Sequence, residues 1–419
     1  MLKFAMSLVV TAATLLALEF AVFPLVLPRL PLNVQPFLPE EVAVLAQSSK
    51  AGTIPQDYVA LTGDSYAQGL GDWLHSLGRL SNGPFHSAHV LHDLSGRDVI
   101  SLGRGGGGSI TGIVFRPLDY FVRLQSVGRL MPGPPETLVA YFYEGNDLLD
   151  TLLELALLTR EARSGKATDT VATGMLKPSS PLFADALAND SLTDPVSLRS
   201  FIEDSYKRRS ADAADHTAFD SLYFLRFVSA LAQRRGSELF PAAAAPGATQ
   251  RWEIGTRGPR VRVNRRELNI PEALQTPAME INEAETNLAL DAFAASLSVL
   301  IAQPEAQNVC VVYIPSPLSV YELITPPSDA DSDSATAGSP RQKFNMAEVR
   351  ARSAYIREQV GQMTRERGVP FVDATPAITN AAQEYVLHGP RDWRHLNERG
   401  YRLLASEALR CLPPAQPLG

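Results

Sequence analysis

Five short apolar runs divide the chain beyond residue 57 into alternating segments. They occupy residues 58–62, 98–102, 137–143, 308–314 and 370–373, and helical periodicity occupies residues 66–80, 110–130, 344–367 and 398–409. The first, third and fourth runs are continuous rather than alternating, which is typical of strands that are covered on both faces. The pattern therefore predicts an α/β fold, a three-layer α/β/α sandwich around a central parallel sheet of about five strands.

This regularity breaks between residues 151 and 300. Helical periodicity continues at residues 148–160, 222–234 and 284–300, but residues 240–247 are rich in Ala and Pro. We interpret the stretch as a largely helical insertion within one domain that spans residues 57–412, rather than as a second domain. Residues 325–342 are rich in Ser, Asp, Pro and Ala and are expected to form a loop.

The N-terminal segment is apolar, and residues 4–28 contain a single charge, Glu19. A spanning helix needs about 20 apolar residues, although an acid near the bilayer centre costs about 2.5–3.5 kcal/mol. A cleaved signal peptide is the alternative, but no small-x-small site closely follows residues 4–18. We expect residues 1–30 to be a transmembrane signal anchor, residues 31–56 to be a Pro-rich linker, and the remainder to lie on the extracytoplasmic side.

The composition and net charge of the chain argue for an ordinary globular protein that does not bind nucleic acid. The 419 residues are 45% hydrophobic and 20% charged, as in ordinary globular proteins. The net charge of −7 argues against a nucleic-acid partner, which favours a basic surface. The two cysteines, Cys310 and Cys411, cannot form a dense disulfide framework. We expect two separate thiols. A disulfide would require the two Cα atoms to lie within about 7 Å of each other.

The first candidate for chemistry is Ser65, in the sequence Gly63-Asp64-Ser65 at the end of the first apolar run. Ligand crevices in open parallel sheets form at the carboxyl ends of the strands, and a helix that begins there supplies free N–H groups for an oxyanion. The alternative is that Ser65 merely caps the helix. A Gly-x-Ser-x-Gly elbow is excluded, because Ala67 stands two residues after the serine.

A second candidate pair lies near the C-terminus. Asp392 and His395 are three residues apart, directly before an amphipathic helical pattern. A turn at that spacing allows the carboxylate to hold the histidine tautomer that accepts a serine proton. Taken alone, the pair is equally compatible with capping or metal binding.

Two segments rich in Gly and Asn follow the second and third apolar runs. Residues 101–108 include four adjacent glycines, and Gly145-Asn146-Asp147 follows the third run. Glycine lets backbone N–H groups approach a substrate oxygen, and an Asn side chain donates a further hydrogen bond. The glycine run lacks the Gly-Lys-Ser/Thr ending of a P-loop and the spacing of a dinucleotide fingerprint.

In this order the segments resemble the four sequence blocks of the SGNH (GDSL-like) hydrolase family. The resemblance covers residues 57–147 and 308–410 and departs from the family at Ser101, where the second block usually has Asn. The corresponding residues are Gly63-Asp64-Ser65 for the first block, Gly106 for the second, Asn146 for the third and Asp392 with His395 for the last.

The resemblance implies a flavodoxin-like fold and a serine esterase without a metal or organic cofactor. Ser65 would be the nucleophile, His395 its base and Asp392 the residue that orients His395. The backbone N–H groups of Ser65 and Gly106 and the side chain of Asn146 would form the oxyanion hole. The expected substrate is an ester-bearing small molecule or an acylated glycan.

Other functions stay open at this point. Residues 312–317 and 320–321 loosely resemble the corresponding segment of membrane-tethered bacterial members of the SGNH family. This resemblance favours an O-acetyltransferase or acetylesterase acting on exopolysaccharide or cell-wall glycan. An inactive scaffold that binds glycan is the alternative from another class. His86, His89 and His92 lie three residues apart and could share a helical face as metal ligands, but they lack an acidic or Cys partner set.

Overall fold

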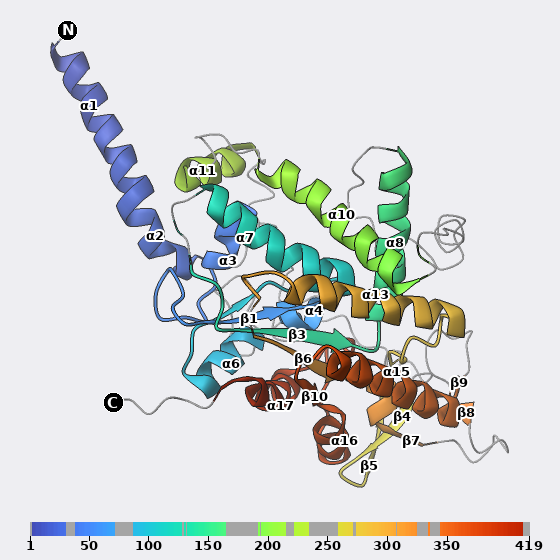
Figure 1. Ribbon diagram of the computed structural model, residues 1–419. Coiled ribbons are helices and arrows are strands. Elements are labelled where there is room, and N and C mark those ends of the chain that lie inside the picture. The colour runs from blue at the N-terminus through green and yellow to red at the C-terminus, as the bar shows by residue number, and fades with distance from the viewer. Residues whose placement is uncertain are drawn as a thin grey trace.

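The computed structural model describes residues 2–30, 38–71, 87–127, 130, 132–164, 192, 194–214, 222–233, 259–270, 274–306, 308–324, 334–335 and 344–413. A five-stranded sheet lies at the centre of this part of the chain (Figure 1). Its strands are β1 (Val59–Thr62), β2 (Val99–Ser101), β3 (Thr137–Tyr143), β6 (Val309–Ile314) and β10 (Phe371–Asp373). They pair in parallel in the order β2-β1-β3-β6-β10, so the five predicted strands and their orientation are confirmed.

Helices cover both faces of the sheet (Figure 1). On β3, Ala140 and Phe142 face one hydrophobic core, whereas Val139, Tyr141 and Tyr143 face the other. The first core is covered by the π-helical segment η4 (Ile110–Phe115), α7 (Arg116–Val127), α8 (Asp147–Ser164), α10 (Pro195–Ala214) and α13 (Glu283–Ile301). The second is covered by α4 (Ser65–Gln68), α6 (Ser87–Ser95), α16 (Thr375–Glu384) and α17 (Glu398–Ala408). Helix α15 (Met346–Glu366) contributes to both cores.

Side-chain caps set where the long helices begin. Helix α13 starts with a capping box, in which Asn282 accepts from the Glu285 N–H at 3.0 Å and Glu285 accepts from the Asn282 N–H at 2.7 Å. Asn345 accepts from the Ala347 N–H at 2.7 Å and so begins α15. These caps satisfy N–H groups that have no partner within the helix.

The stretch between β3 and β6 is largely helical in its described part. It contains α8, α10, α11 (Tyr223–Gln233) and α13, and the Phe293 ring of α13 packs edge-on against Phe142 of the sheet at 5.0 Å. It also contains a hairpin that the sequence did not predict, formed by β4 (Arg260–Val263) and β5 (Arg266–Asn269). Asn264 and Arg265 have φ of 49° and 60°, as a two-residue turn of this kind requires. Residues 240–247 lie outside the described residues.

Short elements complete the described chain. Strand β7 (Glu322–Leu323) extends the hairpin, and β8 (Ser334–Ala335) pairs with β9 (Phe344–Asn345). Helix α14 (Pro317–Val320) follows β6, and the 3-10 helix η8 (Leu409–Cys411) follows α17. Of the loop expected at 325–342, the structure describes only residues 334–335.

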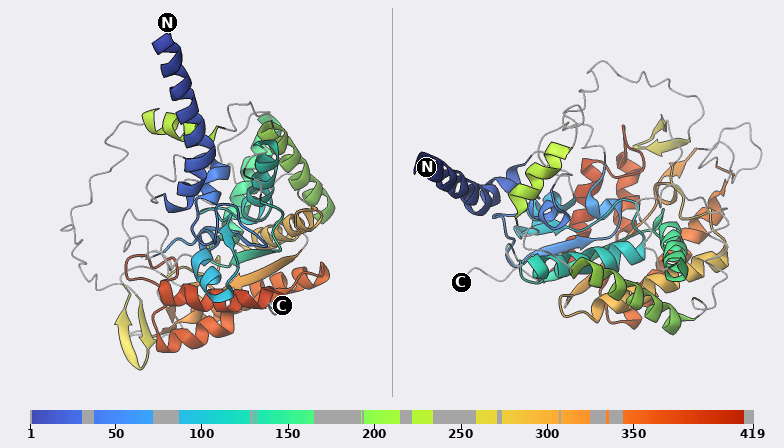
Figure 2. Two further views of the ribbon diagram at one scale, coloured as in Figure 1. Left: turned by 90° about the vertical axis from the view of Figure 1, so that its left-hand side faces the viewer. Right: turned by 90° about the horizontal axis from the view of Figure 1, so that it is seen from above.

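A long apolar helix projects from the domain at the N-terminus (Figures 1 and 2). It comprises α1 (Leu2–Ala17), the π-helical turn η1 (Leu18–Val22), α2 (Phe23–Val26) and the 3-10 turn η2 (Leu27–Arg29). Over 27 residues from Lys3 to Arg29 it is long and apolar enough to cross a membrane, and only 11% of its most apolar 18-residue stretch is buried. Helix α13 is also long and apolar enough, but 61% of its most apolar 18-residue stretch is buried, as expected for a core helix.

The described part of the predicted linker belongs to the domain. Helix α3 (Glu40–Leu45) inserts Val42 and Leu45 into the first core. The Val99 N–H donates to the Ser49 carbonyl at 2.9 Å, so the segment runs along the β2 edge of the sheet. Residues 38–56 therefore add to the core rather than spanning open solvent as a tether.

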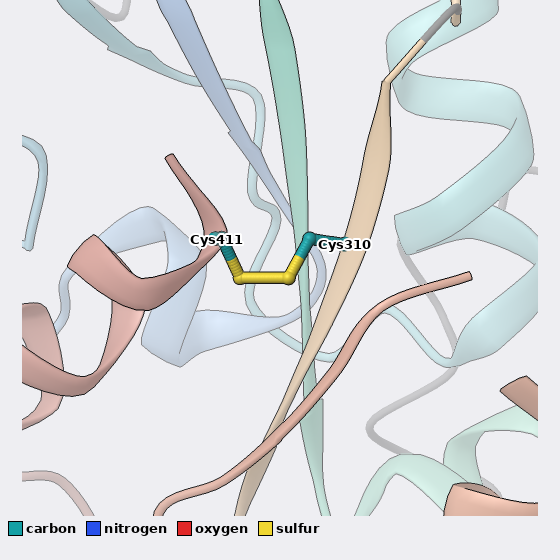
Figure 3. Close-up of a disulfide and its surroundings, with 2 residues drawn as sticks. All are labelled: Cys310 and Cys411. Atoms are coloured by element: carbon teal, nitrogen blue, oxygen red, sulfur yellow. A yellow bond between two sulfur atoms is a disulfide. The ribbon is translucent and has the colours of Figure 1, made fainter. Parts of the chain in front are cut away.

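Cys310 and Cys411 form a disulfide (Figure 3). The prediction of two separate thiols was therefore wrong. The chain end returns through α17 and η8 to strand β6, which brings the two Cα atoms to 5.7 Å although the residues are 101 positions apart. Sequence spacing cannot reveal such a contact, because it depends on how α17 packs on the sheet.

Candidate active site

The turn that carries Ser65 begins at Gly63, at the carboxyl end of β1. Gly63 has φ of +133°, and a Cβ there would lie 2.6 Å from the Tyr141 carbonyl oxygen, so only glycine fits. Asp64 caps the helix by accepting from the Tyr66 N–H at 2.8 Å. Ser65 is the first residue of α4, and its hydroxyl donates to Asp64 Oδ2 at 3.1 Å. The alternative in which Ser65 is the cap is therefore not what the structure shows.

Helix α4 is much shorter than the helix predicted over residues 66–80. It ends after Gln68, because Gly69 adopts φ of +80°, and residues 72–80 lie outside the described residues. A helix of four residues carries little macrodipole. Any stabilisation of an anion at Ser65 therefore depends on individual N–H groups rather than on the helix as a whole.

The C-terminal pair forms a closed local turn. His395 Nδ1 lies 2.7 Å from Asp392 Oδ2, and the N–H groups of Arg394 and His395 donate to Asp392 Oδ1 at 3.1 and 3.2 Å. Burial opposes ionisation of Asp392, but the hydrogen bond and charge of His395 outweigh it and hold the pKa of Asp392 below its usual value. The ring is thus oriented with Nδ1 toward the carboxylate, which leaves Nε2 for another partner.

Buried groups that the sequence analysis missed hold this turn in place. His388 is fully buried, and its Nδ1 lies 3.0 Å from the Tyr321 hydroxyl. Burial lowers the pKa of His388 to about 3, so the ring is neutral. The Gly389 N–H donates to the Asp392 carbonyl at 2.9 Å and closes the turn. Tyr321 and His388 are 67 positions apart, and no sequence pattern pairs them.

Tyr66 connects the two turns. Its ring centroid lies 5.5 Å from that of His395 and 4.2 Å from that of Tyr143, and its hydroxyl donates to the Arg394 carbonyl at 2.7 Å. Because Tyr66 is the neighbour of Ser65 in sequence, its contacts with Arg394 and His395 join the Ser65 turn to the C-terminal turn. No hydrogen bond between Ser65 Oγ and His395 occurs among the described contacts.

Asp64 shares the electrostatic environment of both turns. It is fully buried, and burial raises its pKa to about 6, although the Tyr66 N–H and the charge of His395 act in the opposite direction. The Ser65 hydroxyl donates to this carboxyl group at 3.1 Å, so Asp64 competes with the imidazole for the serine hydroxyl. The Gly63-Asp64-Ser65 motif in the sequence does not predict this competition.

The glycine-rich loop passes close to Ser65. A Cβ on Gly105 would lie 3.8 Å from the Ser65 Cβ, and the Gly105 N–H donates to Gln68 Oε1 at 2.7 Å. Gly106, the residue predicted from the sequence, follows in an exposed turn with φ of +71°. Among the described hydrogen bonds its N–H has no acceptor.

Asn146 begins the turn into helix α8. Its Nδ2 donates to Asp150 Oδ2 at 2.6 Å, and its Oδ1 is buried without a hydrogen-bond partner among the described residues. Burial raises the pKa of Asp150 to about 7. The Asp150 contact fixes one N–H of the carboxamide, and the second N–H stays free for another acceptor.

Further acidic residues on α8 and directly after β3 position these loops. Glu154 accepts from the N–H groups of Gly108, Ile110 and Thr111 at 2.8–3.1 Å, which joins α8 to the glycine-rich loop. Glu144, directly before Gly145, is fully buried and accepts from five donor groups on four residues from β6 to α15. These donors are the Tyr313 hydroxyl, the Ser316 N–H and hydroxyl, the Ser319 hydroxyl and the Ser353 hydroxyl.

The described residues contain no group of three His, Cys, Asp or Glu side chains arranged to hold a metal ion. His89 Nε2 lies 2.8 Å from the Ser48 hydroxyl, and His92 Nδ1 lies 2.6 Å from the Arg97 carbonyl. His86 lies outside the described residues. The two described histidines are therefore directed at separate partners.

Five candidate residues thus come from the carboxyl ends of β1, β2 and β3 and from the turn before α17. Tyr66, the neighbour of Ser65 in sequence, contacts Arg394 and His395 in the C-terminal turn, while Gly106 and Asn146 lie on loops that α8 connects. No protein-family model, curated protein or solved structure matches the chain.

Proposed function

We propose that the protein is a serine hydrolase of the SGNH type that cleaves ester bonds, with Ser65 as the nucleophile. The observation that carries the proposal is the Asp392–His395 pair at 2.7 Å, linked through Tyr66 to a serine at the carboxyl end of a parallel strand. The strand order β2-β1-β3-β6-β10 supports a flavodoxin-like sheet, in which ligands bind at this edge.

The reaction begins when the Ser65 hydroxyl turns from Asp64 toward His395 Nε2. His395 takes the hydroxyl proton as Ser65 Oγ attacks the ester carbonyl carbon, and the negative charge of Asp392 stabilises the imidazolium that forms. The C–O bond to the alcohol then breaks, and His395 returns the proton to the departing oxygen. The products of this half-reaction are the free alcohol and an acyl group on Ser65.

The tetrahedral intermediate needs donors for its oxyanion. The Ser65 and Gly106 N–H groups and the free N–H of Asn146 Nδ2 supply them, and the Asp150 contact holds the carboxamide in one orientation. Water then attacks the acyl group, gives its proton to His395, and releases the acid as Ser65 recovers its proton. Donors fixed before the reaction stabilise the transition state without reorganising.

Hydrolysis and O-acetyl transfer share this acyl-enzyme and differ in whether water or a sugar hydroxyl accepts the acyl group. The proposal is tested by turnover of short-chain esters, long-chain esters and acetylated glycans by wild type and Ser65→Ala. Ser406→Ala is the matched control, because Ser406 is an exposed serine of α17. We expect turnover to be lost in Ser65→Ala and kept in Ser406→Ala. Equal turnover in both variants would contradict the assignment.

We also infer that residues 2–29 anchor the protein in a membrane with the domain outside the cytoplasm. The side chains of α1 are exposed throughout residues 3–17, which is costly in water for an apolar helix. The Cys310–Cys411 disulfide supports export, because disulfides persist mainly in oxidising compartments. Carbonate extraction tests the anchor: we expect full-length protein to stay in the pellet, and release into the supernatant would contradict it.

A further inference from the structure

We propose that the base of the N-terminal helix and helix α11 form one lipid-facing surface that seats the catalytic domain on the bilayer. The inference rests on the membrane anchor and is independent of the esterase activity. We name this surface the seating surface and define it by Phe20, Val22, Leu25, Val26 and Val228.

The first observation concerns Glu19, the single charge in residues 4–28. Glu19 is 2% exposed, and its Oε2 lies 3.1 Å from the Leu225 N–H in the first turn of α11. The carboxylate therefore faces α11 rather than lipid, and it accepts from an N–H group that has no partner within that helix. Glu19, the single charge in the apolar segment, therefore links the N-terminal helix to the domain by a hydrogen bond.

Packing around Phe23 fixes the same junction. The Phe23 ring lies 5.6 Å from Phe224, edge to face, and 5.7 Å from Phe227, both on α11. The Thr53 hydroxyl donates to the Pro24 carbonyl at 2.5 Å, and Leu27 is fully buried in the first core. Both views show α11 beside the base of the projecting helix (Figures 1 and 2). The helix thus meets the domain through a packed contact, and the two are expected to move as one body.

The opposite sides of these helices carry apolar side chains that are partly exposed. The side chains of the seating surface are between 41% and 67% exposed. They continue the exposed apolar surface of α1, which includes Phe4, Leu8 and Val9. Helix α11 carries one charged residue, Arg226, among its 11 residues. A short apolar helix next to a membrane span is suited to the interface between headgroups and hydrocarbon.

Helix length sets the depth at which this surface lies. The 16 residues of α1 rise about 24 Å, whereas the hydrocarbon core of a bilayer is about 30 Å thick. The missing length must come from residues 18–22, which include Phe20 and Val22. The Leu225 N–H is hydrogen-bonded to Glu19, which lies within residues 18–22. Helix α11 therefore lies at the same depth, at the outer boundary of the hydrocarbon. Lipid is the occupant we infer, because the surface is continuous with the span.

The test uses full-length protein in vesicles of phosphatidylcholine and phosphatidylglycerol. Both native cysteines are joined in the disulfide, so a spin label reacts only with an introduced cysteine. Val228→Cys is compared with Leu268→Cys on β5, which lies at the other end of the molecule (Figure 1). Val228 and Leu268 are similarly exposed, at 42% and 37%.

Collisions of the label with oxygen and with a water-soluble nickel chelate report depth. We expect the label at position 228 to favour oxygen and the label at 268 to favour the chelate by several-fold. Equal access of the chelate to both positions would overturn the proposal, as would cleavage of the chain before Glu19 in the mature protein. Protection of position 228 that persists in detergent would indicate a protein partner and would also overturn it.

A second variant separates seating from folding. Glu19→Ala removes the acceptor of the Leu225 N–H without touching the domain core, and we expect it to shift the label at position 228 toward the chelate. Intact disulfide and unchanged protease resistance confirm that this variant folds. Ester turnover is not a readout of this proposal, so its failure and that of the proposed activity are distinguishable.

Discussion

The two turns that carry the proposed catalytic residues are stabilised in different ways. In the C-terminal turn, Asp392 accepts hydrogen bonds from residues no more than three positions away. In the Ser65 turn, the decisive contacts are distant in sequence: Gly63 lies against Tyr141, and the Tyr66 hydroxyl donates to the Arg394 carbonyl. Local geometry therefore sets the Asp392–His395 contact, whereas the Ser65 turn depends on the assembled sheet.

The two turns also differ in readiness for reaction. The imidazole of His395 is already paired with its carboxylate, but the Ser65 hydroxyl is bonded to Asp64 and not to His395. Asp392 and His395 are therefore already arranged for the proposed reaction, whereas the Ser65 hydroxyl must first turn from Asp64 toward His395. Substitutions in the two turns therefore test whether Ser65 and His395 act together in ester turnover.

The largest effect is expected from removing the nucleophile or its base. Ser65→Ala and His395→Ala should each lower kcat for ester hydrolysis by several orders of magnitude, on the order of 10⁶ for residues that act as a unit. The double variant should be little worse than either single variant, which steady-state kinetics on one ester will measure. Additive losses would mean that the two residues do not act on the same step.

Asp392→Asn should have a smaller effect, about 10³–10⁴ in kcat. The amide can keep the turn closed, but it loses the counter-charge and favours the wrong histidine tautomer. Circular dichroism should show an unchanged fold, because the hydrogen bonds to the Arg394 and His395 N–H groups can persist. A loss below tenfold would indicate that the turn serves structure alone.

Asn146→Ala tests the oxyanion donor and is expected to cost about 10²–10³ in kcat with little change in KM. The donor acts on charge that develops in the transition state, so substrate binding should hardly change. A variant whose KM rises while kcat is unchanged would instead place Asn146 in substrate binding.

The smallest effect concerns stability and pH at Asp150. The folded state keeps the proton up to pH about 7, whereas the unfolded chain loses it near pH 4, so the folded state binds more protons between these values. The free energy of unfolding should therefore fall as pH rises from 4 to 7. Asp150→Asn should gain roughly 1–3 kcal/mol over wild type at pH 8 and little at pH 4, as urea unfolding at both values will show. A gain of equal size at both pH values would mean that Asp150 does not titrate in this range.

Much of the scaffold could be predicted from the sequence because its signals are local. Continuous apolar runs such as residues 137–143 mark strands buried on both faces, and the structure has a strand at each of the five. The Asp392–His395 contact follows from a spacing of three. Both features depend on neighbours in the chain, so the pattern contains the information.

The features that the sequence did not predict depend on segments far apart in the chain. Cys310 meets Cys411 only because α17 returns to β6, and Tyr321 meets His388 only after the last turn is folded. The helix expected over residues 66–80 ends at Gly69, which adopts a left-handed conformation that periodicity does not reveal. The competition of Asp64 with His395 is likewise a property of the assembled site.

The most direct test of the central claim is the covalent trapping of Ser65. Wild-type protein is treated with a fluorophosphonate, which reacts with an activated serine hydroxyl, and the adduct is located by peptide mass spectrometry. We predict a single phosphonyl group on the peptide that contains Ser65, and its absence in His395→Ala, because the hydroxyl then lacks its base. An unmodified protein, or an adduct on another residue, would contradict the account of Ser65 as the nucleophile.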